Sequence, residues 1–334
     1  MRGQSILPDP YIDEALSSWM HRVRQAVPGP EIHVLWRATQ KEISESPLTT
    51  VYRGGRDIGQ DDYDFGFCLP EIDAFASLYG LSMDWIKSNF APPSKHIVPV
   101  GFRSDYCPQC MEEAVREIGS PVYLKSWRML LKPFCEKHWS VLRSANLSKT
   151  NAICFADDIF SEDSDRPEIL AREARFLELD ASVQLLSLSA VQRLNDLLSS
   201  AQNAQSVEQV ERFILTLMRA VLSPEQLHNY SSVLNYKARA AGSFRAYKDT
   251  LSFYNFPFTT TAITRARAFY LIGLLLGWIS EKAAVAARPA SDFYLATSAS
   301  YIWSRIKSKW RILPILELYS TDLVGISSLI GWHS

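Results

Sequence analysis

The stretch that decides the fold runs from residue 106 to residue 142 and reads YCPQCMEEAVREIGSPVYLKSWRMLLKPFCEKHWSVL. Within it, Cys107 and Cys110 have two residues between them, and Cys135 and His138 repeat that spacing after an interval of 24 residues. Two ligands at this spacing can close a tight turn onto one metal ion, because the intervening backbone turns its amides toward the thiolates. One such pair is common by chance, but two pairs that bracket a loop of this length indicate a metal site.

The residues between the two pairs are typical of a small zinc finger. Residues 111–118 predict a short helix, the Gly-Ser-Pro sequence at 119–121 ends it, and an apolar run over residues 122–134 returns the chain to the metal. Lys137 lies inside the second pair, where its cation can offset the negative charge of the thiolates. We therefore expect one structural Zn²⁺ ion, bound by Cys107, Cys110, Cys135 and His138.

Two other interpretations of the cysteines stay open. Buried or disulfide-linked cysteines would suit a small secreted chain, whereas this chain has 334 residues, an odd number of cysteines and no apparent leader peptide. A zinc hydrolase or nuclease would require an open metal position and a general base, and the sequence has no His-Glu-x-x-His helix. We expect the nearby acids to be solvated and predict no catalytic residue; these acids are Asp105, Glu112, Glu113 and Glu136.

The composition is that of an ordinary globular protein, with 47% hydrophobic residues and a formal net charge of -1. This balance hides an asymmetry, because residues 151–225 hold 13 acidic and 6 basic side chains, whereas residues 237–311 hold 12 basic and 3 acidic ones. The basic third is a candidate surface for a polyanion or an acidic partner, or else a solvated helical surface. The most apolar segment, residues 268–279, is too short to span a bilayer, and we expect a cytoplasmic protein.

The N-terminal part of the chain predicts a helix followed by a helix-turn-helix. Apolar residues recur at helical spacing from residue 15 to residue 23, another helix is expected at 31–41, and an irregular loop with an acidic cluster at Asp61, Asp62 and Asp64 follows. In residues 69–90, Gly80 would turn the chain and Ser82 would cap a second helix. Its outward side chains would contact nucleic acid or a partner, unless the pair is a hairpin used only for packing; they are Asp84, Lys87, Ser88 and Asn89.

From residue 167 onward the sequence predicts helices throughout, with an apolar core helix within a helical segment at 261–287 and a last helix at 293–309. No Gly-rich phosphate loop is present, which disfavours an ATPase. Basic residues alternate with aromatic ones near the end and are candidates for contact with nucleic acid or a partner; they are Arg305, Lys307, Lys309 and Arg311.

These patterns predict a mainly α-helical protein with four parts. They are an N-terminal helical domain containing the helix-turn-helix (residues 1–95), a zinc-finger module (96–150), an acidic linker (151–166) and a C-terminal all-helical domain (167–334).

Taken together, the first 145 or so residues resemble the TniQ/TnsD family of transposon target-selection proteins. The family's opening motif, roughly LPDESLSSWLxRL, is matched with a short insertion by Leu7, Pro8, Asp13, Glu14, Leu16, Ser17, Ser18, Trp19 and Arg22. Its zinc segment is matched by Tyr106, Cys107, Pro108, Cys110, Gly119, Pro121, Tyr123, Trp127, Cys135, His138 and Leu142. Many relatives carry a second cysteine set, but only Cys154 follows here and Cys68 is left over, so we expect a single zinc ion.

The resemblance implies a protein without catalysis of its own. Such proteins connect a chosen target, either attachment-site DNA or an RNA-guided CRISPR effector complex with its guide RNA, to an AAA+ ATPase regulator that recruits the transposase. It also suggests Trp19 and Arg22 as contacts for that regulator. Because the candidate recognition helix is only weakly basic, we favour an adaptor that docks on a CRISPR effector complex, either as a monomer or as a homodimer. A sequence-specific DNA-binding protein, either a direct target-site selector or a transcriptional regulator, is the alternative.

Overall fold

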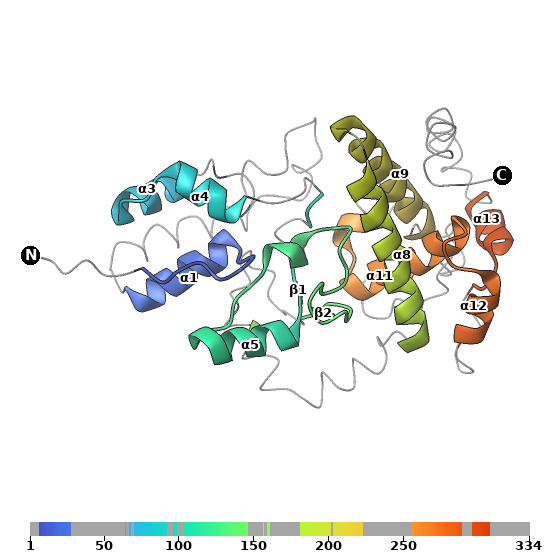
Figure 1. Cartoon of the computed structure of the whole chain (residues 1–334), viewed down its shortest axis with the longest axis horizontal. Helices are drawn as coiled ribbons and strands as arrows, with labels where there is room; N and C mark the ends of the chain where they lie inside the picture. Colours follow the sequence, from blue (N-terminus) through green and yellow to red (C-terminus); the bar gives the residue numbers. More distant parts are fainter. Residues whose placement is uncertain are drawn as a thin grey trace, which may run out of the picture. The chain divides into compact units, whose positions relative to one another are not determined.

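The structure is a computed structural model of the whole chain, coloured from the N-terminus to the C-terminus in Figure 1. It describes residues 7–27, 64, 67, 70–91, 96–98, 103–145, 156, 159–160, 181–201, 203–222, 256–288 and 296–307. These residues are mostly α-helical, with one two-stranded sheet among them, which confirms the predicted fold class. The chain divides into two compact units, Met1–Phe176 (unit 1) and Leu177–Ser334 (unit 2).

Several predicted features lie outside the described residues. They include the helix at 31–41, most of the irregular loop that follows it, most of the acidic linker, and parts of the helical region predicted from residue 167 onward. The same holds for Cys68, Cys154, Lys309 and Arg311, and for the side chain of Lys307.

Unit 1 contains three helices that share one core: α1 (Leu16–Ala26), α3 (Pro70–Tyr79) and α4 (Met83–Phe90). Trp19 of α1 lies at the centre of this core and is fully buried. The centroid of its indole lies 5.7 Å from the ring of Phe75, 5.3 Å from that of Trp85 and 5.2 Å from that of Phe90. Aromatic pairs at such distances add to the stability that area burial supplies, so α1, α3 and α4 form one packed core.

Helices α3 and α4 form the predicted pair with a turn between them. Gly80 adopts a φ of 66°, a left-handed conformation that glycine tolerates without a Cβ penalty. The Ser82 side chain then accepts a hydrogen bond from the backbone N–H of Trp85 at 3.1 Å and caps α4 as predicted. The inner faces bury Ile72, Phe75, Ala76, Ile86 and Phe90, while Tyr79 and Trp85 are partly buried.

The segment that carries the four candidate metal ligands also belongs to unit 1. Its helix, α5 (Pro108–Ile118), starts at Pro108 rather than at the predicted residue 111, because proline is well suited to a first helical turn. It ends at Gly119, whose φ of 75° closes the helix in the left-handed conformation. A short 3₁₀ helix, η3 (Lys125–Arg128), follows, and β1 (Asp105–Tyr106) pairs antiparallel with β2 (Arg143–Ser144) to close the base of the segment.

Unit 2 is built around α11 (Ala262–Leu275), which packs against α8 (Ala181–Ser200), α9 (Ala204–Leu222) and α13 (Ala299–Lys307). The apolar face of α11 extends around nearly the whole helix, which confirms the predicted core helix. A short 3₁₀ helix, η4 (Phe256–Thr259), precedes it and packs against α9.

The helical segment predicted over residues 261–287 is divided into two helices. The chain leaves the helix after Leu275, turns at Gly277 with a φ of 69°, and starts α12 (Glu281–Ala287) after the capping side chain of Ser280. The last helix likewise begins at Ala299, since residues 296–298 are not helical. Within the described part of the chain, no helix combines the length and the apolar character needed to cross a membrane.

Candidate metal centre

The four predicted ligands converge in unit 1. Cys107 precedes the first turn of α5 and Cys110 lies within that turn, while Cys135 and His138 come from a tight turn held by backbone hydrogen bonds. Their candidate ligand atoms all lie within 4.8 Å of one another. The Nδ1 atom of His138 lies 3.4 Å from the Cys107 sulfur, 3.3 Å from the Cys110 sulfur and 3.6 Å from the Cys135 sulfur. This cluster could hold one metal ion.

The cysteines are not joined by a disulfide. The sulfurs of Cys110 and Cys135 lie 3.5 Å apart, whereas a disulfide bond is about 2.05 Å long. All three cysteines are free and buried, and His138 is partly buried. This geometry removes the disulfide interpretation for the three cysteines and leaves a group of thiols that face a shared centre.

Crowding makes the three thiols unequal in their affinity for protons. Hydrogen bonds that the other two thiols provide lower the pKa of Cys135. Side-chain hydrogen bonds with Cys107 and Cys135, together with burial, raise the pKa of Cys110. Once Cys135 is a thiolate, a nearby positive charge is needed before Cys110 can lose its proton as well. A divalent cation among the three sulfurs would supply that charge.

The residues around the cluster differ from the expectation in two ways. Glu113 is not simply solvated: its Oε1 lies 3.2 Å from Nε2 of His138, and its side chain is 23% exposed. Lys137 pairs with Oε2 of Glu113 at 2.7 Å. This ion pair lowers the pKa of the Glu113 carboxyl and raises that of Lys137. Glu113 thus contacts Lys137 with one carboxylate oxygen and His138 with the other.

The other acids near the cluster fall into two groups. Glu112 and Glu136 are exposed, as expected, and Glu136 pairs with Lys132. Asp105 was expected to be solvated but is 2% exposed, and its carboxylate accepts a hydrogen bond from the hydroxyl of Ser144. Asp105 therefore serves to join β1 to β2, and it does not face the sulfurs.

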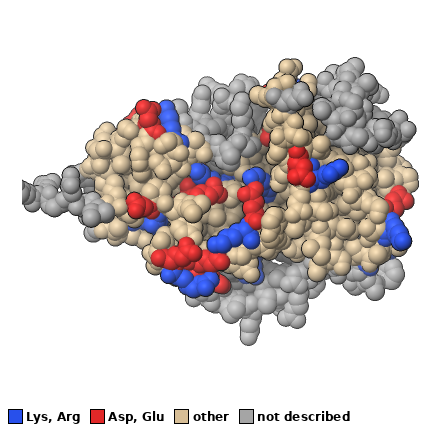
Figure 2. Space-filling model, viewed as in Figure 1, with Lys and Arg blue, Asp and Glu red and all other residues tan. Residues whose placement is uncertain are grey.

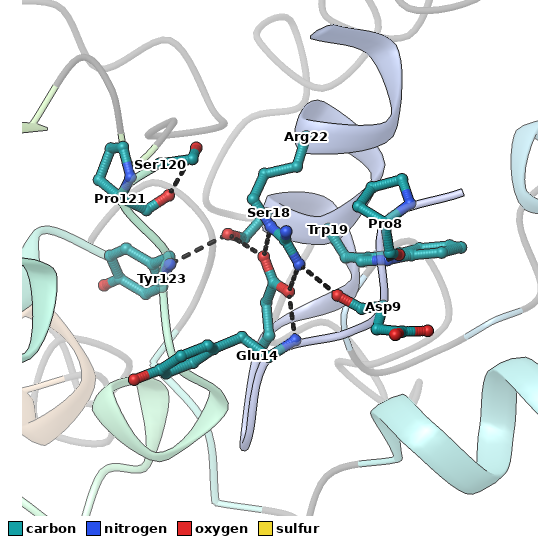
Figure 3. Close-up of polar contacts among 10 residues, drawn as sticks. Pro8, Asp9, Glu14, Ser18, Trp19, Arg22, Ser120, Pro121 and Tyr123 are labelled. Carbon is teal, nitrogen blue, oxygen red and sulfur yellow. Dashed lines mark hydrogen bonds and ion pairs between the residues drawn. The ribbon is translucent and has the colours of Figure 1, made fainter. Parts of the chain in front are cut away.

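The residues of the N-terminal motif form a buried polar network, drawn in Figure 3. Oε1 of Glu14 accepts hydrogen bonds from the Ser18 hydroxyl and from Nε of Arg22, both at 2.9 Å, and Oε2 accepts one from Nη2 of Arg22 at 2.6 Å. The same Arg22 nitrogen donates to the backbone carbonyl of Asp9 at 2.8 Å. A buried charge pair with this many hydrogen bonds satisfies most of its polar atoms internally.

This network docks α1 onto the chain that follows α5. The backbone N–H of Tyr123 donates to the Ser18 hydroxyl at 3.0 Å, and the N–H of Ala15 donates to the Tyr123 carbonyl at 2.9 Å. Next to them, the N–H of Lys125 donates to the carbonyl of Asp13 at 2.7 Å. Two segments more than 100 residues apart in the sequence therefore share a short stretch of strand-like hydrogen bonding.

The burial of Trp19 and Arg22 argues against the predicted contact of these side chains with an ATPase regulator. Trp19 is 0% exposed and its indole N–H donates to the carbonyl of Pro8 at 2.7 Å, while Arg22 is 7% exposed. Both side chains hold the segment that precedes α1 in place.

A second buried network centres on Asp64, one of three acids expected in an irregular loop. Its Oδ1 accepts the backbone N–H of Ser17 at 2.7 Å, and its Oδ2 pairs with the guanidinium of Arg128. Arg103 lies 3.6 Å from the same oxygen, and the Arg128 guanidinium stacks on the Tyr123 ring at 4.6 Å. Asp64 thus links α1 to the residues between the two ligand pairs. The sequence did not predict this role, because Asp64 lies in a cluster of acids that is typical of an exposed loop.

The outward side chains predicted on α4 are exposed: Asp84, Lys87, Ser88 and Asn89. They carry one acid and one base, and the side chains of Ser88 and Asn89 bond to the backbone of their own helix. On the face drawn in Figure 2, acidic and basic side chains are interspersed among the described residues. Arg305 on α13 is partly buried and has a partner within the chain.

Comparisons with protein-family models, with curated proteins and with solved structures found no match to this chain.

Proposed function

We propose that the cluster of Cys107, Cys110, Cys135 and His138 holds one structural zinc ion. With Zn–S bonds of about 2.3 Å and Zn–N bonds of about 2.0–2.1 Å, a tetrahedral site has S–S edges of about 3.8 Å and S–N edges of about 3.5 Å. The distances of 3.5 Å between two sulfurs and 3.3 to 3.6 Å from sulfur to Nδ1 are close to these values. Four protein ligands complete the coordination of zinc, which favours a structural ion over a catalytic one.

We further propose that the chain is a transposition target-selection adaptor without catalytic activity. It would link a target-recognition element, with an RNA-guided CRISPR effector complex favoured, to an AAA+ ATPase regulator and a transposase. The observation that carries this proposal is the contact between the two motifs of the resemblance. The N-terminal motif and the metal-binding segment, far apart in the sequence, are joined through the Ser18–Tyr123 hydrogen bond in one unit.

Direct DNA recognition is the second candidate, because α4 follows a tight turn and exposes Lys87, Ser88 and Asn89. The acid Asp84 in the first turn of α4 weighs against it, since DNA phosphates repel carboxylates and a recognition helix usually carries several basic residues. The charge of the exposed face therefore favours a protein or ribonucleoprotein partner.

A pull-down of the tagged chain from cells that express its neighbouring genes distinguishes the two candidates. We expect a CRISPR effector complex to be recovered together with the ATPase regulator, and to be retained after nuclease treatment. Recovery of the ATPase with duplex DNA that nuclease removes would instead support direct target-site recognition. Recovery of neither would contradict the proposal, and tight sequence-specific binding of duplex DNA in a gel-shift assay would contradict the adaptor mode.

A further inference from the structure

His138 faces two different environments with its two ring nitrogens. Nδ1 points to the three sulfurs, at 3.3 to 3.6 Å, and Nε2 points to the Glu113 carboxylate, at 3.2 Å. A neutral imidazole carries one N–H and one lone pair, so only one nitrogen can bind a metal while the other donates a hydrogen bond. The arrangement therefore requires the proton on Nε2 when Nδ1 is the ligand.

The fold places Glu113 for this contact. Glu113 lies three residues after Cys110 on α5, so one helical turn carries its carboxylate from the ligand pair toward His138. Its other oxygen binds Nζ of Lys137 at 2.7 Å, and Lys137 directly precedes His138 in the chain. Glu113 thus contacts the second ligand pair at two points, although it belongs to the helix of the first.

We propose that Glu113 is a positioning residue of the metal centre. By accepting the Nε2 proton of His138, it selects Nδ1 as the ligand atom and fixes the plane of the ring toward the sulfurs. Carboxylates that hold a ligating histidine in this way contribute to metal affinity without touching the metal. This inference rests on the proposed zinc site and adds to it a residue that the cysteine and histidine spacing does not indicate.

The test compares metal binding by full-length variants that differ at one acid of α5. Zinc affinity is measured by competition with a chromophoric chelator, and the ligand set is followed by the visible absorption of Co²⁺ bound in place of zinc. Glu113→Ala should weaken zinc binding by about 10- to 100-fold, the range found when such supporting carboxylates are removed. Glu112→Ala, on the same helix with an exposed side chain, is the matched control and should match the unmodified chain.

Two further variants separate positioning from simple stability. Glu113→Gln keeps the shape of the side chain and one acceptor oxygen, so the variant should fold. Its zinc affinity should lie between that of the unmodified chain and that of Glu113→Ala. Lys137→Met removes the exposed ion pair but leaves the histidine contact, and it should weaken zinc binding by less than about fivefold. Nitrogen NMR of His138 in the zinc-loaded chain should report a protonated Nε2 and a metal-bound Nδ1.

The inference is overturned if Glu113→Ala and Glu113→Gln bind zinc as tightly as Glu112→Ala does, or if the NMR spectrum places the proton on Nδ1. Its failure differs from failure of the metal site. An unmodified chain that binds neither Zn²⁺ nor Co²⁺ would refute the proposed zinc centre itself, and the role of Glu113 with it. An unmodified chain that binds zinc while all acid variants behave alike would refute only the role of Glu113.

Discussion

Units 1 and 2 are stabilised by different physical means. Unit 1 has short helices and is joined by groups that need specific partners: a cluster of four ligands, the buried pair of Glu14 and Arg22, and the buried carboxylate of Asp64. Unit 2 is organised mainly by apolar packing around α11, with buried Arg265 and Tyr270 of that helix donating hydrogen bonds to backbone carbonyls. We therefore expect single polar changes to damage unit 1 severely, and unit 2 to respond mainly to changes of volume.

The largest effect should follow from loss of the metal. Cys135→Ser, or treatment with a strong chelator, should abolish amide-hydrogen protection across residues 103–145 and leave α8, α9 and α11 protected. The reason is that metal-binding free energy in such sites is folding free energy, with apparent values of about 10–16 kcal/mol in zinc-finger peptides. Hydrogen-exchange mass spectrometry of the full chain measures both units at once. Loss of protection in both units, or in neither, would contradict the comparison.

The next largest effect should come from breaking the buried pair. Arg22→Ala should destabilise unit 1 by about 3–5 kcal/mol, because it leaves the Glu14 carboxylate buried without its cation. Urea denaturation, followed by the fluorescence of the buried tryptophans, measures the change in the free energy of unfolding. The control is Arg212→Ala in unit 2, which removes an exposed pair with Glu208 and should cost less than about 1 kcal/mol. If both substitutions lowered the free energy of unfolding equally, the proposed difference between the units would be contradicted.

In unit 2 a change of volume should matter more than a change of charge. A Cβ at Gly273 would lie 2.7 Å from Cδ1 of Ile279 and 3.0 Å from Cβ of Ala190, so Gly273→Ala should cost about 1–3 kcal/mol through overpacking. Adding Ile279→Val removes the closest atom and should recover part of the loss. Thermal unfolding of the single and double variants tests this, and additive losses would count against the steric explanation.

The smallest effect should appear at the exposed face of α4. Ser82→Ala removes the side-chain acceptor at the start of the helix and should cost about 1 kcal/mol in unit 1. Lys87→Ala, on the exposed face, should change the stability by less than about 0.5 kcal/mol. Chemical denaturation resolves the two values. If Lys87→Ala proved as destabilising as Ser82→Ala, Lys87 would have a structural role rather than one at an exposed interface.

The comparison also explains what the sequence could predict. The cluster of three cysteines and His138 was predictable because the spacing within each pair is local, and α11 was predictable because an apolar run of that length has to be buried. The break at Gly277 was missed, since a single glycine in an apolar run is tolerated in a helix as well as in a turn. A glycine in an apolar run therefore does not show whether the helix continues or ends there.

The contacts of Arg22, Asp64 and Glu113 depend on partners that only the folded chain brings to them. Arg22 is predicted to contact an ATPase regulator, whereas its burial depends on Glu14 and on the fold of the segment before α1. Asp64 meets Ser17 across 47 residues and Arg128 across an even longer interval. Glu113 is predicted to be solvated, but its carboxylate contacts His138. The sequence does not show this contact, because the orientation of the His138 ring is set by the folded turn. A helical offset of three from Cys110 was the one signal that could have drawn attention to it.

The central claim is that four residues of unit 1 hold one structural zinc ion, and the most direct test is the zinc content of the purified chain. Inductively coupled plasma mass spectrometry should find about one zinc per chain in the unmodified protein and in Cys154→Ser, and far less in Cys107→Ser. Absence of zinc from the unmodified protein, or an equal zinc content in Cys107→Ser, would contradict the account.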